Sequence, residues 1–363
     1  MPYESVAWIL GAGFSKALGG PLLNELISDR IRHSLQNIET PPDDSLSCCV
    51  TELFEDGRKR GLLWQDAEQF LEMLEIAANN HKSATSTLIA SLARTPYEKR
   101  FPNSGIDAKG LLVKIHTEAV RFVAGACTSF LSAAEGNPDI VSNSERWEPF
   151  VKWAQSLETT DTVITFNYDR SLALLGASET CPRLDFSVPP RVTRIAHEPS
   201  PARRSVKAYH MHGSVAWTRA SADSERFVDE ERAVAHENPE RAVLGIPGVG
   251  KKALAQGHLK GIWDEALTRL ASAKAVVFVG YRFPETDNMA KRALLGALKA
   301  QTDSSLHIVL GPNSPDAARL RRMLEWTRPA RKDISVITDH QMFAQDFMAV
   351  FDRQVLINAK WKP

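Results

Sequence analysis

The stretch VAWIL at residues 6–10, followed at once by GAGFS at residues 11–15, decides the fold. Five apolar residues without alternation are typical of a strand that is buried on both faces of a parallel sheet. Leucines and isoleucines then recur at helical spacing between Leu18 and Ile31. The sequence therefore predicts a unit of strand, glycine turn and helix that opens near residue 5.

Strands and helices alternate again in the second half of the chain. Such alternation predicts an α/β fold with a Rossmann-like, doubly wound parallel sheet. The strands are expected at residues 162–166, 207–211, 275–279, 305–310 and 334–338, and the later helices near 254–272, 286–300, 314–326 and 340–355.

The segment between the first unit and these strands has a different pattern. Residues 45–157 carry amphipathic helical spacing and little strand signal. We therefore expect an inserted helical subdomain at 45–157, and a Rossmann-like domain made of residues 1–44 and 158–363.

The composition of the 363-residue chain excludes several classes of protein. Hydrophobic residues make up 43% and charged residues 24%, as in ordinary globular proteins, so wholesale disorder is excluded. The 44 Lys and Arg residues balance the 44 Asp and Glu residues, which removes the global basic field of a nucleic-acid-binding protein. We expect no direct sequence-specific binding of nucleic acid.

Membrane and secretory signals are not found in the sequence. No apolar run is long enough for a membrane-spanning helix, and the first residues lack the pattern of a signal peptide. Four cysteines are scattered without a C-x-x-C pair, which argues against a zinc ribbon and a disulfide framework. We expect a reduced, cytoplasmic protein without membrane partners.

The glycine turn at residues 11–13 is the first candidate binding site. It follows a buried strand and opens a helix, where free N–H groups and the helix dipole favour a pyrophosphate. Lys16 stands where the usual dinucleotide fingerprint has its third glycine, so a bare tight turn is the alternative. The small Ala12 and Ser15 favour a nucleotide.

Polar residues follow the strands at 162–166 and 207–211. Asn167 and Asp169 lie at the sheet edge where open α/β sheets bind ligands, and an Asx turn at Asp169 is the alternative. His210 and His212 share the H-x-H spacing of a metal pair, but no third ligand is evident. Histidines packed in a strand are the other interpretation, and we expect no metal.

Two further segments carry glycine or charge. Residues 245–252, GIPGVGKK, resemble a phosphate-binding P-loop but have Lys252 in place of the hydroxyl residue that binds magnesium. A glycine-rich connection that holds Lys251 near the pocket is the favoured interpretation. Asp287 lies at the predicted start of a helix, where it could be an ordinary cap.

Taken together and in this order, these segments resemble the sirtuin superfamily, and more closely the bacterial sirtuin-like NAD hydrolase domains of antiphage defence. Residues 11–15 match the GAGxS loop of that family, 166–169 (FNYD) its F/T-N-Y-D element, and 212–214 its catalytic HGS. Residues 280–287, GYRFPETD, are similar to its GYS-x-P-x-x-D element. Each motif alone is weak, but four in family order over nearly the whole chain are a strong signal.

One departure from the superfamily concerns zinc. Protein-deacetylating sirtuins carry a four-cysteine zinc module after the HG element, and here no cysteine follows Cys181. We therefore expect no zinc and no acyl-lysine deacylation. Arg282 stands where the family often has serine, which we regard as minor.

The resemblance implies an NAD glycohydrolase, which cleaves the nicotinamide–ribose bond of its substrate NAD to nicotinamide and ADP-ribose. It assigns catalysis to Asn167, which would orient water and ribose hydroxyls, to His212 as proton acceptor, and to Asp169. It implies that the contacts to NAD are made by Gly11, Ala12, Gly13, Phe14, Ser15, Gly280, Tyr281, Asp287 and Asn313.

The resemblance also implies partners. The family depletes NAD as an abortive-infection defence, so its activity must be held off until phage infection. We expect no further sensor domain after the predicted sheet, and therefore control by self-assembly as a homo-oligomer or by a partner encoded nearby. A HerA-type ATPase is the favoured partner and a short Argonaute the second. We expect the helical segment to mediate assembly, and the arginine-rich loop at 191–204 to be a solvated loop rather than a partner contact.

Two alternatives from other classes stay open. A non-catalytic module that senses NAD or ADP-ribose would keep the glycine loop but would need neither Asn167 nor His212. A P-loop nucleotidase built on residues 245–252 would depend on Lys251.

Overall fold

The predicted first strand forms as β1 (Val6–Leu10) and is the central strand of a seven-stranded sheet. It pairs in parallel with β2 (Thr162–Thr165) on one side and with β9 (Ala275–Val279) on the other. The strand order is β11-β10-β9-β1-β2-β5-β3, with every neighbouring pair parallel. The predicted Rossmann-like α/β fold is therefore confirmed. The other strands are β3 (Arg183–Phe186), β5 (Ser205–His210), β10 (Ser305–Val309) and β11 (Ile337–Asp339).

The structure is a computed structural model. It describes residues 4–36, 43–61, 64–80, 82–186, 192–194, 204–221, 227–230, 232–246, 249–300, 304–327 and 337–358.

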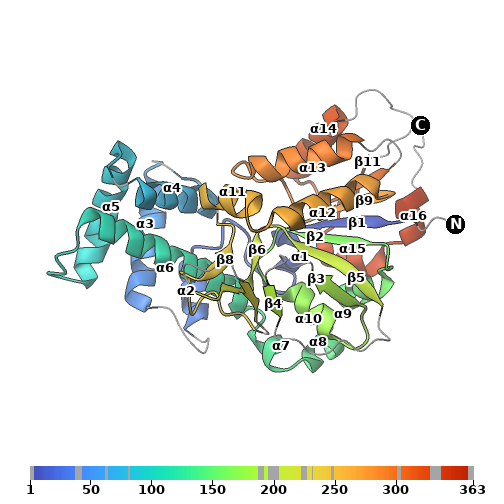
Figure 1. Ribbon diagram of the computed structural model, residues 1–363, viewed down its shortest axis with the longest axis horizontal. Coiled ribbons are helices and arrows are strands. Elements are labelled where there is room, and N and C mark those ends of the chain that lie inside the picture. The colour runs from blue at the N-terminus through green and yellow to red at the C-terminus, as the bar shows by residue number, and fades with distance from the viewer. Residues whose placement is uncertain are drawn as a thin grey trace.

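Helices cover both faces of the sheet (Figure 1). All five residues of β1 are buried, and they alternate between the faces: Ile9 packs in one cluster and Trp8 in the other. The cluster of Ile9 includes α12 (Lys260–Ser272), α13 (Asn288–Ala300) and α14 (Pro315–Thr327). The cluster of Trp8 includes residues of α1 (Ala12–Lys16), α9 (Glu148–Ser156), α10 (Ser171–Ala177), α15 (Ala344–Val350) and α16 (Arg353–Asn358).

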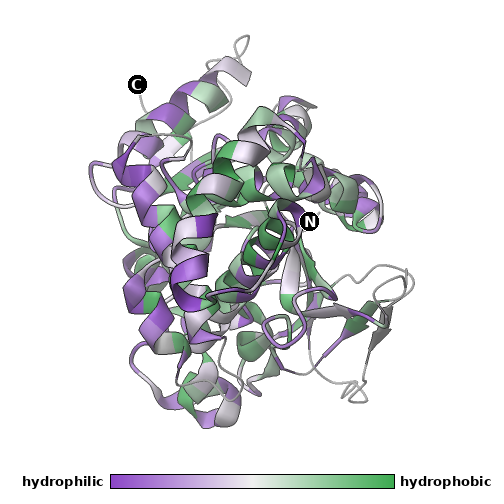
Figure 2. Ribbon diagram, turned by 90° about the vertical axis from the view of Figure 1, so that its left-hand side faces the viewer, coloured by the Kyte–Doolittle hydropathy of each residue, from purple (hydrophilic) through white to green (hydrophobic). Residues whose placement is uncertain are grey.

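Four long helices form the region at the left of Figure 1. Each begins at an aspartate or serine whose side chain accepts the free backbone N–H groups of the first turn, as at Asp43 and Ser83. Figure 2, which looks onto this region, shows mainly hydrophilic residues on the outer helices around a largely hydrophobic one. The helices are α3 (Asp44–Lys59), α4 (Ala67–Asn79), α5 (Ala84–Arg100) and α6 (Ala108–Ser129), and α2 (Asp29–Leu35) packs against α6.

The segment predicted as one helical subdomain, 45–157, is helical but belongs to two hydrophobic clusters. Residues of α3 to α6 share a core with one another and with Val215, Ala235 and Ile246 from later in the chain. Residues 131–157, which include α7 (Ser132–Gly136) and α8 (Asp139–Asn143), pack on the sheet through side chains such as Trp153. The four-helix part is therefore the segment that stands apart from the sheet.

A second, four-stranded sheet was not predicted. Its order is β4-β7-β6-β8, and its strands are β4 (Val192–Arg194), β6 (Gly213–Arg219), β7 (Phe227–Asp229) and β8 (Ala242–Leu244). The strand β6 pairs antiparallel with both β7 and β8. Three of these strands have only three residues, too few for a periodic pattern to identify.

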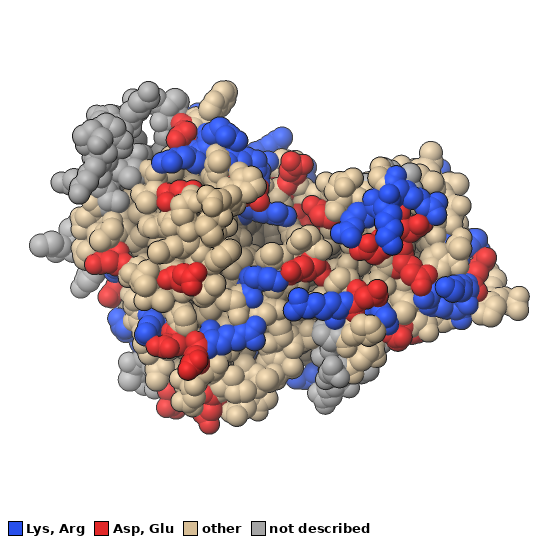
Figure 3. Space-filling view, turned by 180° about the vertical axis from the view of Figure 1, so that it is seen from behind, with Lys and Arg blue, Asp and Glu red and all other residues tan. Residues whose placement is uncertain are grey.

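The described residues also bear on membranes and charge. None of their helices combines the length and the apolarity that crossing a bilayer requires. On the face seen in Figure 3, basic and acidic side chains are interspersed over both the sheet and the helical region.

Candidate active site

A cavity of about 590 Å³ opens at the carboxyl edge of the central strands. Open α/β sheets bind ligands at the point where the strand order reverses, which here is at β1 and β9. The volume lies within the range of small-molecule sites, roughly 300–1,000 Å³. Its lining brings together the four motif segments: residues 11–15 except Phe14, residues 166–169, His212, and Gly280, Tyr281 and Asp287.

The two glycine loops of the cavity pack against each other. A Cβ on Gly11 would lie 2.6 Å from the Gly280 carbonyl oxygen, and one on Gly13 would lie 2.6 Å from the Gly280 Cα. Gly280 itself has a φ of 65°, which favours glycine. The close contact between the loop after β1 and the loop after β9 is therefore sufficient reason for glycine at these positions, without any ligand.

This packing corrects one expectation for the turn at residues 11–13. The Gly11 N–H donates to the Val279 carbonyl at 3.0 Å, and the Gly13 N–H donates to the Gly280 carbonyl at 3.2 Å. Both amides are therefore paired within the protein and are not free to bind a pyrophosphate. The helix that follows, α1, has only five residues, so its dipole is short.

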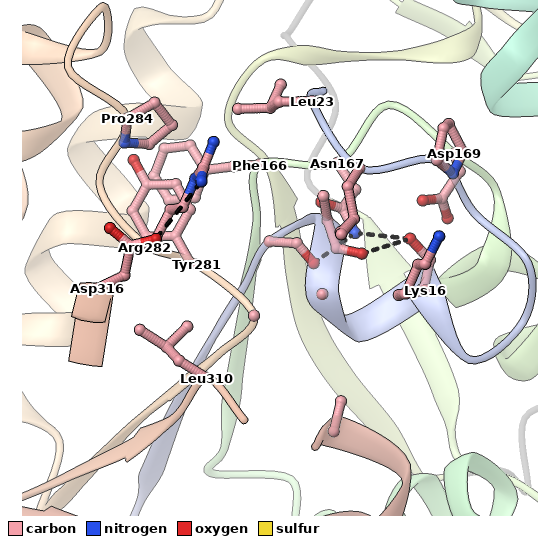
Figure 4. Close-up of a pocket in the computed structure, with 18 of the residues that line it drawn as sticks. Lys16, Leu23, Phe166, Asn167, Asp169, Tyr281, Arg282, Pro284, Leu310 and Asp316 are labelled. Carbon is pink, nitrogen blue, oxygen red and sulfur yellow. Dashed lines mark hydrogen bonds and ion pairs between the residues drawn. The ribbon is translucent and has the colours of Figure 1, made fainter. Parts of the chain in front are cut away.

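Asn167 is held against the glycine loop from the end of β2 (Figure 4). Its Nδ2 donates to the Gly11 carbonyl at 3.0 Å and to Ser15 Oγ at 3.3 Å. Its own N–H donates to Thr165 Oγ1 at 3.1 Å, which fixes the backbone after the strand. The carboxamide is therefore oriented before any ligand binds.

Asp169 lines the cavity but is committed to a turn. Its Oδ1 accepts the N–H of Ser171 at 2.9 Å and the Ser171 hydroxyl at 2.5 Å, which is the geometry of an Asx turn. Burial raises the pKa of Asp169, and the hydrogen bonds from Ser171 and Ser15 oppose that shift. The contacts of Asp169 are therefore those of the Asx turn that the sequence analysis gave as the alternative. Through this turn Asp169 stabilises the loop that carries Asn167.

Asp287 is the centre of a buried polar cluster. Its side chain is 1% exposed, and Oδ2 lies 3.1 Å from His212 Nε2 and 3.3 Å from Lys251 Nζ. The Tyr281 hydroxyl donates to the same oxygen at 3.3 Å. The other oxygen, Oδ1, accepts the Ala290 N–H at 3.4 Å and so caps α13, as the sequence suggested.

The cluster sets the charges of its members. Burial alone would raise the pKa of Asp287, but His212 and Lys251 beside Oδ2 outweigh it, and the pKa lies well below its usual value. Burial, followed by the Lys251 ammonium, lowers the pKa of His212 below 6.5, against the opposing pull of Asp287. At neutral pH the cluster therefore holds an aspartate anion and a neutral imidazole.

Glu68 reaches the cavity from the helical region, and no motif in the sequence pointed to it. It lies on α4, is 7% exposed, and accepts a hydrogen bond from the Thr286 hydroxyl, next to Asp287. Burial raises the pKa of Glu68, and Lys251 opposes that shift. One carboxyl group on an otherwise ordinary amphipathic helix has no motif around it, so only the fold reveals this contact.

An aromatic stack and an ion pair form the far side of the cavity (Figure 4). The rings of Phe166 and Tyr281 stack with centroids 4.1 Å apart and an angle of 15°. Arg282 lies 3.4 Å from Asp316 on α14, and both line the cavity. The sequence analysis treated Arg282 as a minor departure and missed Asp316.

Two residues singled out in the sequence, Phe14 and Asn313, lie outside the cavity wall. The Phe14 side chain is fully buried and packs edge-on against Phe150 and Trp153, so it faces the core. Asn313 is exposed in a left-handed conformation with φ 54°, and its N–H donates to Gln341 Oε1. The neighbouring Gly311 and Ser314 line the cavity in its place.

His210 and His212 do not act as a pair. His210 stacks on Phe186, with Nδ1 3.2 Å from the Asn167 carbonyl, and burial lowers its pKa to about 4. It is thus a histidine packed in a strand, whereas His212 faces the cavity. Among the residues described by the structure, no three His, Cys, Asp or Glu side chains are grouped to hold a metal ion.

The segment at residues 245–252, which resembles a P-loop, does not follow a strand of the parallel sheet. The strand before it, β8, belongs to the small second sheet, and α11 (Val249–Gln256) begins within the segment itself. Lys251 therefore lies on a helix rather than in a glycine-rich connection, but its Nζ lies 3.3 Å from Asp287 Oδ2 and so is near the cavity, as expected. Residues 247 and 248 lie outside the described residues, as does most of the arginine-rich loop, of which Arg204 pairs with Glu158 at 3.6 Å.

In comparisons with known proteins, no family model matches the chain and no curated protein matches it.

Proposed function

We propose that this protein is an NAD glycohydrolase, with NAD as substrate and with nicotinamide and ADP-ribose as products. The observation that carries the proposal is the convergence of four motif segments on one cavity. Residues 11, 167, 212 and 287 are far apart in sequence, yet all line the same space at the switch point of the sheet. Loops that follow parallel strands meet at one edge of any such sheet, so the support comes from the Asn167, His212 and Asp287 side chains that these loops place in the lining.

The reaction needs no general acid for the leaving group, but it needs polar groups held in fixed positions around the ribose. The nicotinamide of NAD is a cationic leaving group, so it departs as a neutral molecule without protonation. The site must stabilise an oxocarbenium-like ribose and orient a water molecule. A rigid carboxamide and a neutral imidazole in the lining of one cavity are suited to this task.

Asn167 and His212 are the residues proposed for these roles. With Nδ2 held by Gly11 and Ser15, the Asn167 carboxamide presents its oxygen in a fixed orientation to a water molecule or a ribose hydroxyl. His212 is buried and neutral at pH 7, so it can accept the proton that the attacking water releases. Asp287 orients the imidazole through Nε2.

The glycine loop takes a different role from a dinucleotide fingerprint. Because the Gly11 and Gly13 amides are paired with β9 and its loop, they are not the donors to the pyrophosphate. We propose that small residues at 11–13 allow the pyrophosphate to approach the backbone closely, and that Ser15 and Arg282 supply polar contacts from the cavity wall. The adenosine then lies toward Gly311 and Ser314 rather than Asn313.

The proposed biological role is depletion of NAD in an infected bacterial cell. Uncontrolled cleavage of NAD would kill the host, so the activity needs a control. We propose that it comes from self-assembly or from a partner, with a HerA-type ATPase favoured over a short Argonaute. The four-helix region contributes Glu68 to the cavity, so a change in this region can reach the site directly.

The experiment is to follow NAD loss and nicotinamide release by chromatography with the purified protein and two variants. Asn167→Ala should abolish turnover, whereas Asn143→Ala, an exposed asparagine on α8, should retain it. If no turnover is seen, the assay is repeated with the product of the neighbouring gene. Turnover that survives Asn167→Ala would refute the proposed site, and silence in every assembly would refute the enzyme.

A binding module that senses NAD or ADP-ribose is the second candidate. The two hydrogen bonds donated by Asn167 Nδ2 favour this candidate, because they join the loop after β2 to the glycine loop and so give Asn167 a structural role. Calorimetry with ADP-ribose separates the two. Undiminished affinity in Asn167→Ala and His212→Ala, together with no turnover in any assembly, would favour the sensor.

A further inference from the structure

Lys251 is a buried cation that the proposed chemistry does not yet use. Its side chain is only 6% exposed, and within the described residues Nζ is in hydrogen-bond geometry with no acceptor. Its nearest partner is Asp287 Oδ2 at 3.3 Å. Burial of an ammonium group is costly, so a lysine held in this way beside a cavity is a candidate for a role in the site.

Lys251 and His212 approach the same oxygen atom. Nε2 of His212 lies 3.1 Å from Asp287 Oδ2, on the side of the loop after β5, and Lys251 approaches from α11. A carboxylate with a single histidine partner favours an imidazolium, because an ion pair then forms. When a permanent cation already balances the carboxylate, the imidazole does not need a charge.

The other groups that face this pair come from several elements. Glu68 on α4 is electrostatically coupled to both Lys251 and Asp287. Tyr281 donates to Asp287 from the loop after β9, and Tyr168, which donates to the Gly245 carbonyl at 2.8 Å, lies beside His212. Burial raises the pKa of both tyrosines well above 10, so they stay neutral. The ammonium group of this set belongs to Lys251.

We propose that Lys251 is a positioning residue of this site: its ammonium balances the Asp287 carboxylate, so that His212 is held in place by Asp287 as a neutral base. The inference rests on the proposed hydrolase for its effect on turnover. Its effect on the proton affinity of His212 does not depend on any activity.

The direction of the effect follows from charge. In Lys251→Met a chain of similar length remains without its charge, and Asp287 has His212 as its nearest cationic partner. The pKa of His212 then rises by at least about one unit, which is a tenfold change in the proton-binding constant. Turnover falls about tenfold at pH values well below both pKa values and recovers at pH 9, so the acid limb of the profile moves to higher pH. KM changes by less than about threefold, because Lys251 does not line the cavity.

The test measures the pKa of His212 by NMR of ¹⁵N-histidine-labelled full-length protein, with His212→Gln to assign the signal. Lys251→Met is compared with Lys252→Met, a change at the exposed neighbouring lysine, and with Lys251→Arg, which keeps the charge. The Lys252 variant should match the wild type, and the arginine variant should recover most of the shift.

The outcomes are separable. An unchanged His212 pKa in Lys251→Met would overturn the inference even if NAD is hydrolysed. A raised pKa without turnover in any assembly would uphold it and refute the hydrolase. If Lys251→Met does not fold, Lys251→Gln, which also removes the charge, takes its place in the comparison. A His212 pKa above 6.5 in the wild type would overturn the inference.

Discussion

Gly13 and Gly280 are in such close contact that neither can carry a side chain. A Cβ on Gly280 would lie 2.4 Å from the Gly13 Cα, and one on Gly13 would lie 2.6 Å from the Gly280 Cα. The contact joins the loop after β1 to the loop after β9, which are the two sides of the switch point. The cavity is therefore built on a junction of two backbones.

The first prediction concerns this junction. Gly280→Ala should lower the free energy of unfolding by about 3 kcal/mol, because the left-handed φ and the overlap with Gly13 both oppose a side chain. The control is Gly296→Ala in α13, where a Cβ would meet nothing within 4 Å and should stabilise the protein by up to about 1 kcal/mol. Urea denaturation of the two variants measures both effects. If Gly280→Ala were as stable as Gly296→Ala, the two backbones would be able to move apart and accommodate the added Cβ.

The second prediction concerns the amide of Asn167. Asn167→Asp keeps the shape of the side chain but replaces the Nδ2 donor by an acceptor, which would face the Gly11 carbonyl and Ser15 Oγ. We expect turnover to fall on the order of 100-fold, and stability by about 1–2 kcal/mol. Nicotinamide release and thermal unfolding are the two measurements. Full turnover in this variant would mean that the orientation of the carboxamide is irrelevant to the reaction.

Much of the fold could be predicted because buried parallel strands leave a plain signal. The strand at 275–279 was predicted at the residues where β9 lies, and 162–166 and 305–310 differ from β2 and β10 by one residue. The edge strand β3 and the small sheet were missed, since short strands with mixed burial have no continuous apolar run. Of the last predicted strand, 334–336 lie outside the described residues.

The site was predictable only where local motifs carry it. Residues 11–13, 15, 167, 212 and 287, which line the cavity, could be predicted because each follows a strand or precedes a helix in a recognisable pattern. The charged residues that contact this site from distant parts of the chain could not be predicted. Glu68 meets Thr286 across 218 positions of sequence, and Asp316 on α14 meets Arg282 across 34 positions. Such pairs depend on how the helical region and the sheet pack together, which no local pattern contains.

The third prediction is a pH dependence of stability at the end of the sheet. His307 Nε2 donates to the Leu356 carbonyl at 3.0 Å, and Nδ1 lies 3.0 Å from His340 Nε2. Burial lowers the pKa of His307 to about 4. The unfolded chain therefore binds a proton between pH 6.5 and 4 that the folded protein excludes, so stability is present above pH 6.5 and is lost as the pH falls.

The loss attributable to His307 should be on the order of 2 kcal/mol at pH 4.5. It is measured as the difference in unfolding free energy between the wild type and His307→Gln, which keeps a donor for Leu356 but does not titrate. The gap between the two proteins should narrow from pH 7 to pH 4.5. Asn143→Ala, a change at an exposed residue of α8 that carries no titratable group, serves as the comparison and should show a constant gap. A constant gap for His307 would contradict the prediction.

The fourth prediction concerns the ion pair between Arg353 on α16 and Asp161, the residue before β2. Both guanidinium nitrogens of Arg353 donate to Asp161, at 2.5 and 2.8 Å, and the carboxylate is fully buried. Asp161 also accepts the N–H groups of Val6 and Glu158. Arg353→Ala leaves this carboxylate without a cation and should cost about 3 kcal/mol, since its two backbone donors remain.

Arg353→Lys should recover only part of that loss, because an ammonium group cannot form the bidentate contact. The control is Lys152→Ala, which removes an exposed pair with Glu148 on α9 and should change stability by less than about 0.5 kcal/mol. Chemical denaturation of the three variants gives the comparison. The order expected is Lys152→Ala, Arg353→Lys, Arg353→Ala from most to least stable. Equal losses for Lys152→Ala and Arg353→Ala would mean that the buried pair contributes no more than a surface pair. In that case α16 would be held by its apolar contacts, such as Leu356 in the sheet core, rather than by Asp161.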